Sequence, residues 1–172
     1  VVDRGGDAPH GLVGAAAGNS EGSDTPEALK TAAYDGCFQA IEAIWRDEGG
    51  ATLDDIALMA TTSSVLANRF SHFFWTGFYR VAGERLVVGP YIGTVGCLQI
   101  DFGRGVCGTA AARRETVIVP DVNAFPGHIA CDPNSKSEIV VPVFGADGEL
   151  IAVLDVDSDR LDAFDEIDRR GP

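Results

Sequence analysis

The residues best suited to chemistry in this chain are three cysteines in its second half. Cys97, Cys107 and Cys131 fall within a stretch of 35 residues, and glycines lie within a few positions of each. Cysteines that serve packing normally lie on apolar stripes, so cysteines in glycine-flanked, loop-like sequence indicate thiol chemistry. The fourth cysteine, Cys37, lies on the apolar face of a predicted helix and is expected to be a buried core thiol.

The three thiols differ in their local surroundings. Cys107 is predicted at the start of a short helix, where free N–H groups and the helix dipole favour the thiolate, although packing beneath the loop explains it equally well. Cys131 follows His128 by three residues, and this imidazole could orient the thiol or cap a turn. Cys97 is expected in a strand near Val95–Ile100, where packing alone could explain it.

A zinc site is the main alternative for this set of cysteines together with His128. Structural zinc sites use close cysteine pairs, separated by about two to four residues. Here nine and twenty-three residues separate the successive cysteines. Metal is therefore the weaker interpretation, and no metal site is predicted. Disulfide exchange needs only that two thiols meet in space.

A second group of candidate residues lies in the last predicted hairpin. Strand alternation places Asp155 and Asp157 on one face, and a turn at 145–148 would place Glu138 opposite Asp155. A tighter turn at 147–148 would place Glu138 opposite Asp157 instead. Either register brings three carboxylates together unless a bulge intervenes.

Such a cluster has chemical consequences. Like charges a few ångströms apart raise at least one carboxyl pKa, which suits a general acid or an anchor for a cationic group such as an amine. A solvated acidic edge is the ordinary alternative. The apolar residues around the cluster in both strands favour the functional interpretation.

Two aromatic residues could complete a binding pocket. Trp75 and Tyr79 share one face of a predicted strand across Gly77. Their rings could grip a methyl, thioether or ammonium group. Core packing is the commoner use of such residues, and strand periodicity alone does not decide between the two.

The elements that must position these residues predict an α+β fold. Thr25 is expected to cap a first helix that ends near 49–50, and Thr52 to cap a second. Hairpin-linked strands follow, interrupted by the short helix 106–113 and a long loop, 121–137, that holds Cys131. Two helices followed by such strands predict an antiparallel sheet with helices packed on it.

Composition bounds the rest. Residues 1–23 have no periodicity and are predicted to be a flexible leader, followed by one domain over 24–172. The net charge of −13 argues against a nucleic-acid partner. The sequence contains no apolar run of roughly 20 residues and no signal segment at its start, so no membrane association is expected. A cytoplasmic location is expected, where cysteines serve catalysis more often than disulfide frameworks.

The sequence resembles the free methionine-(R)-sulfoxide reductases, a catalytic branch of the GAF domain family. The resemblance runs from about the first helix to the end of the chain, and its motifs together are specific to this branch. The matching segments are 75–79, 89–90, Cys97, 102–111, 121–123, 125–132, 137–140 and 154–158.

The resemblance implies a GAF-like fold and reduction of free methionine (R)-sulfoxide, with thioredoxin as reductant and no cofactor. It makes Cys131 the attacking thiol, with Cys97 or Cys107 resolving the sulfenic acid. It also implies that Trp75 and Tyr79 cradle the S-methyl end. The roles implied for the acidic residues are to hold and protonate the sulfoxide oxygen or to bind the amino group: Glu138, Asp155 and Asp157.

Three points stay open at this stage. Helix-terminus physics favours Cys107 as the readiest thiolate, whereas the resemblance favours Cys131. GAF domains often pair through terminal helices, so a homodimer is open, although the final helix is short here. The alternative functions are a non-catalytic GAF sensor of a small ligand and a thiol redox sensor that turns over no sulfoxide.

Overall fold

A six-stranded antiparallel sheet forms the centre of the computed structural model, which describes residues 25–129 and 131–171. The strands are β1 (Phe73–Ala82), β2 (Arg85–Ile92), β3 (Gln99–Asp101), β4 (Val117–Val119), β5 (Ser137–Phe144) and β6 (Leu150–Ser158). Their order across the sheet is β3-β2-β1-β6-β5-β4. The predicted leader lies outside the described residues.

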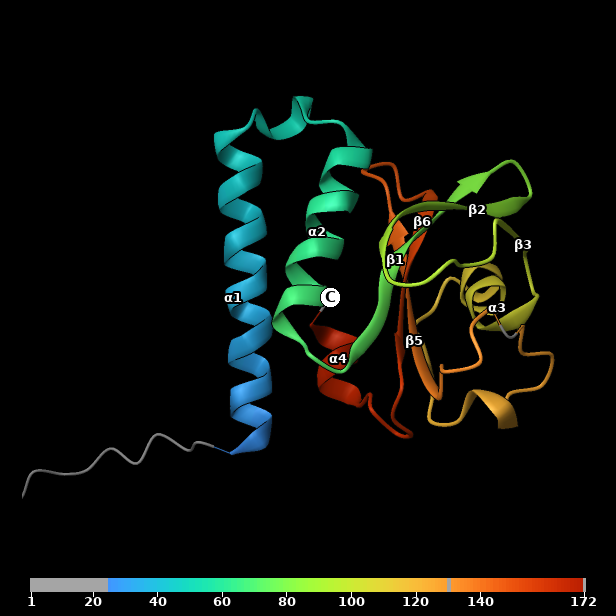
Figure 1. The fold of residues 1–172 in the computed structure, drawn as a ribbon. Coiled ribbons are helices and arrows are strands. Elements are labelled where there is room, and N and C mark those ends of the chain that lie inside the picture. Colours follow the sequence, from blue (N-terminus) through green and yellow to red (C-terminus); the bar gives the residue numbers. More distant parts are fainter. Residues whose placement is uncertain (1–24, 130, 172) are drawn as a thin grey trace, which may run out of the picture.

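Helices cover both faces of this sheet, as Figure 1 shows. They are α1 (Pro26–Asp47), α2 (Asp55–Arg69), α3 (Gly105–Arg113) and α4 (Glu166–Arg170), with 3-10 turns at Gly50–Thr52 and Val122–Ala124. The helices α1, α2 and α4 lie on one side of the sheet, and α3 lies on the other (Figure 1). The predicted α+β architecture is confirmed. None of the helices described is long and apolar enough to cross a bilayer.

Of the two predicted helix N-caps, the one at Thr25 is confirmed and the one at Thr52 is not. The Thr25 hydroxyl accepts the N–H of Ala28 at 3.2 Å, as expected for the N-cap of α1. The expectation that Thr52 caps α2 was wrong, because the Thr52 hydroxyl bonds back to the carbonyl of Gly49. Asp54 caps α2 instead, and its Oδ1 accepts the N–H of Ile56 at 2.8 Å. A carboxylate near a helix N-terminus is favoured by the helix dipole as well.

Strand alternation divides the core into two clusters, one on each face of the sheet. On the side of α1 and α2, Phe78 and Leu154 pack against helix residues such as Met59. On the side of α3, Tyr79 and Val153 pack with the apolar residues of that helix. The two faces of β1 thus belong to different cores, and the predicted functional residues lie on the side of α3.

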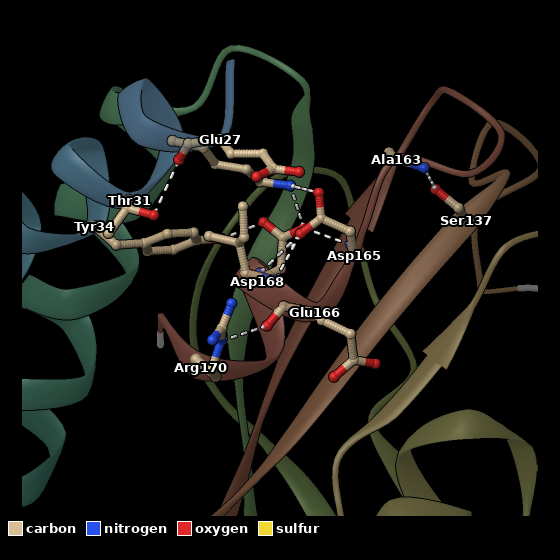
Figure 2. A network of polar contacts seen from close by, with 11 residues as sticks. Glu27, Thr31, Tyr34, Ser137, Ala163, Asp165, Glu166, Asp168 and Arg170 are labelled. Atoms are coloured by element: carbon tan, nitrogen blue, oxygen red, sulfur yellow. Dashed lines mark hydrogen bonds and ion pairs between the residues drawn. The ribbon is translucent and has the colours of Figure 1, made fainter. Parts of the chain in front are cut away.

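A buried polar network fixes the last helix to the first (Figure 2). The Asp168 side chain is fully buried and accepts the Tyr34 hydroxyl at 2.7 Å. It also accepts Lys30 Nζ from α1 and the backbone N–H of Asp165, so the buried carboxylate is satisfied by three donors. The network joins α4 to α1 on the far side of the sheet from the predicted site.

Candidate active site

The acidic cluster follows from the register of three neighbouring strands. In β6, Asp157 pairs with Trp75 of β1 on one side and with Glu138 of β5 on the other. Two residues earlier, Asp155 pairs with Gly77 in β1. Because residues two apart share a face, all these side chains lie on the face that α3 covers. The predicted cluster of three carboxylates is present.

The register is the second of the two that the sequence left open. Glu138 lies opposite Asp157, although the chain turns over Gly145–Glu149 rather than in a tight turn at 147–148. A bulge between Val143 and Phe144 accounts for the difference, since it shifts the pairing by one residue. The bulge lies near the turn, so it adjusts the register before the strands reach the site and leaves the carboxylates together.

Burial dominates the electrostatics of the cluster. Glu138 and Asp155 are 5% and 6% exposed, and burial next to other carboxylates raises the pKa of both side chains well above the usual range. Burial also raises the pKa of Asp157 to about 6, opposed by a hydrogen bond from the Ser135 hydroxyl. Glu138 and Asp155 therefore hold their protons more tightly than ordinary carboxyl groups do, and Asp157 is the readiest of the three to ionise.

Cys107 lies in the first turn of α3 and points into the same cluster. Its Sγ is 3.8 Å from Glu138 Oε1, and the residue is 4% exposed. Burial and the nearby carboxylates raise the pKa of this thiol well above its usual value. The expectation that the helix terminus makes Cys107 the readiest thiolate was therefore wrong, because the carboxylates and burial outweigh the helix dipole.

The other two cysteines form a disulfide. Cys97 and Cys131 are 34 residues apart in sequence, and their Cα atoms are 5.5 Å apart. Cys97 precedes β3, which begins at Gln99, so the prediction of a strand at Cys97 was wrong and this residue lies in a loop. Cys131 lies in the predicted long loop and is exposed. Cys37 is a buried free thiol of the core, as predicted.

Aromatic rings form one side of the site. The indole of Trp75 stacks on Tyr79 and on Tyr91, with ring centroids 5.7 Å and 5.0 Å away. Gly77 permits this arrangement, because a Cβ there would lie 2.2 Å from the Cβ of Tyr91. Tyr91, which pairs with Gly77 across the two strands, thus lies beside Trp75.

One cavity brings the predicted residues together. Trp75, Tyr79, Cys107, Cys131 and the three carboxylates all line it. Cys97 does not line the cavity, but it packs against the aromatic cluster beside it and is bonded to Cys131.

Sequence reasoning did not single out several other residues of this site: Thr94, Arg104, Asp132 and Ser135 line the cavity, and Tyr91 stacks beside it. In the sequence, Arg104 and Asp132 stood out only as parts of the matching segments 102–111 and 125–132. Three of these residues lie within three positions of a candidate cysteine, and this proximity of a hydroxyl or a charge could have identified them: Thr94, Arg104 and Asp132.

The same cavity contains a group of atoms spaced closely enough for a metal ion. The thiol of Cys107 and carboxylate oxygens of Glu138 and Asp155 lie within 4.8 Å of one another. This set differs from the alternative that the sequence raised, because Cys97 and Cys131 bond to each other. Within the cluster, the Cys107 thiol donates to Glu138 Oε1 at 3.8 Å.

The fold and site place the chain in a known family. The family model for the GAF domain matches residues 50–170, and the chain belongs to this family. GAF domain-containing protein A of Dictyostelium discoideum is 45% identical over 152 residues, which cover 88% of this chain and 92% of that protein.

Relatives at similar identity carry a more specific name. The free methionine-R-sulfoxide reductase of Escherichia coli is 44% identical over 116 residues, which are 67% of this chain and 70% of that one. The structure of the free methionine-R-sulfoxide reductase of Neisseria meningitidis, in complex with its substrate, matches with a TM-score of 0.73. Its sequence is 41% identical, with 86% of this chain and 84% of that one covered. The resemblance to this branch of the family is confirmed.

The raised pKa of Asp157 predicts how the stability of the oxidised protein depends on pH. The folded state holds this proton more tightly than the unfolded state, so the stabilisation is complete below about pH 4 and is lost as the pH rises through about 6. Asp157→Asn should therefore gain roughly 2 kcal/mol in unfolding free energy relative to the wild type between pH 4 and pH 8. Urea unfolding across this range measures the difference.

Asp159→Asn, which removes an exposed carboxylate two residues further along the chain, is the control and is unfolded in urea over the same pH range. If the unfolding free energies of the wild type and Asp157→Asn depend on pH in the same way, the raised pKa of Asp157 is contradicted.

Proposed function

We propose that this protein reduces free methionine (R)-sulfoxide to methionine with its cysteine thiols, and that thioredoxin returns the enzyme to its reduced form. The observation that carries the proposal is the exposed Cys131, disulfide-bonded to Cys97, on the wall of a cavity that also holds three clustered carboxyls. The similarity to the free methionine-R-sulfoxide reductases of E. coli and N. meningitidis supports the same substrate.

Cys131 is the attacking thiol in this proposal, and Cys97 resolves. Cys131 is exposed and lines the cavity, whereas Cys97 does not line it. Cys107 is the weaker candidate, because burial beside carboxyl groups keeps its sulfur protonated. The Cys97–Cys131 disulfide is the product that this pair would form.

The chemistry balances with these groups. Sulfur of Cys131 attacks the sulfoxide sulfur, a carboxylic acid protonates the oxygen, and transfer of that oxygen leaves methionine and a sulfenic acid on Cys131. The Cys97 thiol then attacks the sulfenic sulfur, which forms the disulfide and releases water. A dithiol such as thioredoxin reduces the disulfide by exchange and is itself oxidised.

The protonation states of the cluster divide its roles. Burial beside other carboxyls raises the pKa of Glu138 and Asp155 well above the usual range, and these two residues are proposed as the acid that protonates the sulfoxide oxygen. Asp157 ionises at about pH 6 and is proposed to hold the substrate ammonium. Trp75 and Tyr79, which stack beside it, are proposed to contact the S-methyl end.

Arg104 is proposed to complete the recognition of a free amino acid. It is the only lysine or arginine among the residues that line the cavity. A free amino acid carries an ammonium and a carboxylate. The acidic cluster supplies a negative charge for the ammonium, and Arg104 supplies a positive charge for the carboxylate. A residue within a peptide lacks both terminal charges, so this pairing favours the free substrate.

A homodimer and a cytoplasmic location stay predictions.

Substrate choice tests the proposed reaction. With thioredoxin, thioredoxin reductase and NADPH, the free (R) epimer should yield methionine and consume NADPH, while the (S) epimer and peptide-bound sulfoxide react poorly. Methionine is measured by chromatography and NADPH by absorbance. Absence of methionine from every epimer would favour a ligand or redox sensor over an enzyme.

Replacing single carboxyls tests the division of roles. Glu138→Gln keeps the shape but removes the proton donor, so kcat should fall by about 100-fold or more. Asp157→Asn removes the charge that binds the ammonium, so KM should rise by about tenfold or more. Steady-state methionine formation gives both constants.

Glu149→Gln, at an exposed carboxylate in the β5–β6 turn, is the control and should change neither constant. An unchanged kcat in Glu138→Gln would exclude this residue as the acid.

A further inference from the structure

A hydrogen bond between side chains joins the two loops that carry the redox cysteines. One loop, residues 93–98, contains Cys97, and the other, residues 120–136, contains Cys131. The Thr94 hydroxyl donates to Asp132 Oδ2 at 2.6 Å. Within 25–129 and 131–171 this is the only hydrogen bond between the two loops.

Contacts with the sheet hold Thr94 in position. Its carbonyl accepts the indole N–H of Trp75 at 3.0 Å, and Trp75 is 4% exposed in the core of the site. Gly93 lies flat against the same indole, because a Cβ at this residue would be 2.5 Å from the ring. Thr94 is therefore anchored to β1 through Trp75.

Asp132 is held in place to receive this hydroxyl. Its other carboxylate oxygen, Oδ1, accepts the backbone N–H of Asn134 at 2.7 Å. The hydrogen bonds from Thr94 and Asn134 lower the pKa of Asp132, so the carboxylate is ionised at neutral pH and the bond from Thr94 is charge-assisted.

Asp132 directly follows Cys131, and Thr94 precedes Cys97 by three residues. We propose that the Thr94–Asp132 hydrogen bond is a latch that holds the two loops together when the disulfide opens and so keeps Cys97 within reach of Cys131. Thr94 and Asp132 are then positioning residues for disulfide formation. They act by raising the effective concentration of one sulfur at the other.

Thermodynamic linkage gives this latch a measurable effect. If the disulfide strengthens the latch, the latch must favour the disulfide by the same factor. The equilibrium with glutathione reports this factor directly: oxidised glutathione takes two electrons and two protons from the Cys97 and Cys131 thiols, giving the protein disulfide and two molecules of reduced glutathione. The latch serves the proposed reductase cycle and rests on it for its purpose, but this equilibrium needs no sulfoxide.

The experiment equilibrates the full chain in glutathione buffers of graded ratio and counts the Cys97 and Cys131 thiols by alkylation and peptide mass spectrometry. Thr94→Val keeps the branched shape without the hydroxyl, and should lower the equilibrium constant for disulfide formation by about fivefold. Thr94→Ser restores a hydroxyl and should return the constant towards the wild-type value.

Thr31→Val is the matched control, because the Thr31 hydroxyl is also exposed but bonds to a carbonyl within α1. This variant should have the wild-type constant. The proposal is overturned if Thr94→Val matches the wild type, if Thr94→Ser falls as far as Thr94→Val, or if Thr31→Val falls equally. Failure of sulfoxide reduction in the wild type would leave these outcomes readable, so the two proposals fail separately.

Discussion

The antiparallel pairing of β6 with β1 and β5 is the constraint on which the site depends. This strand lies between the other two, so each residue on its inner face has a neighbour on both sides. Asp157 consequently lies between Trp75 and Glu138, which puts an aromatic ring and a second carboxyl beside it. A slip of one residue in either pairing would turn these side chains to the opposite face.

Burying three carboxyl groups together is unfavourable when all of them are ionised, and protonation of some of them relieves the repulsion. Isolated buried charges are expensive, and neutral acids avoid most of that expense. Cys107 belongs to the same system, since its thiol lies against Glu138 and shares its burial. A site that holds protons in this way can deliver one to a departing oxygen while Asp157, the most acidic member, holds a positive charge. Cys131, the exposed half of the disulfide, lines the same cavity as these carboxyl groups.

The sequence predicted the carboxylate cluster and the two faces of β1 because strand alternation depends only on local order. It left the β5–β6 register open, since the bulge at Val143 and Phe144 has no distinctive sequence. Cys107 was misjudged because its pKa is raised first by burial and then by Asp155 and Glu138, which are distant in sequence. The Cys97–Cys131 pairing and the contact of Thr94 with Asp132 join loops that meet only in the folded chain. No local pattern predicts such contacts.

The central claim is that Cys131, and not Cys107, receives the sulfoxide oxygen. The most direct measurement mixes reduced Cys97→Ser protein with one equivalent of free methionine (R)-sulfoxide, traps sulfenic acid with a dione reagent, and locates the label by peptide mass spectrometry. The account predicts the label on Cys131 and one methionine for each label. A label on Cys107, or methionine formed while Cys131 stays unlabelled, would contradict it.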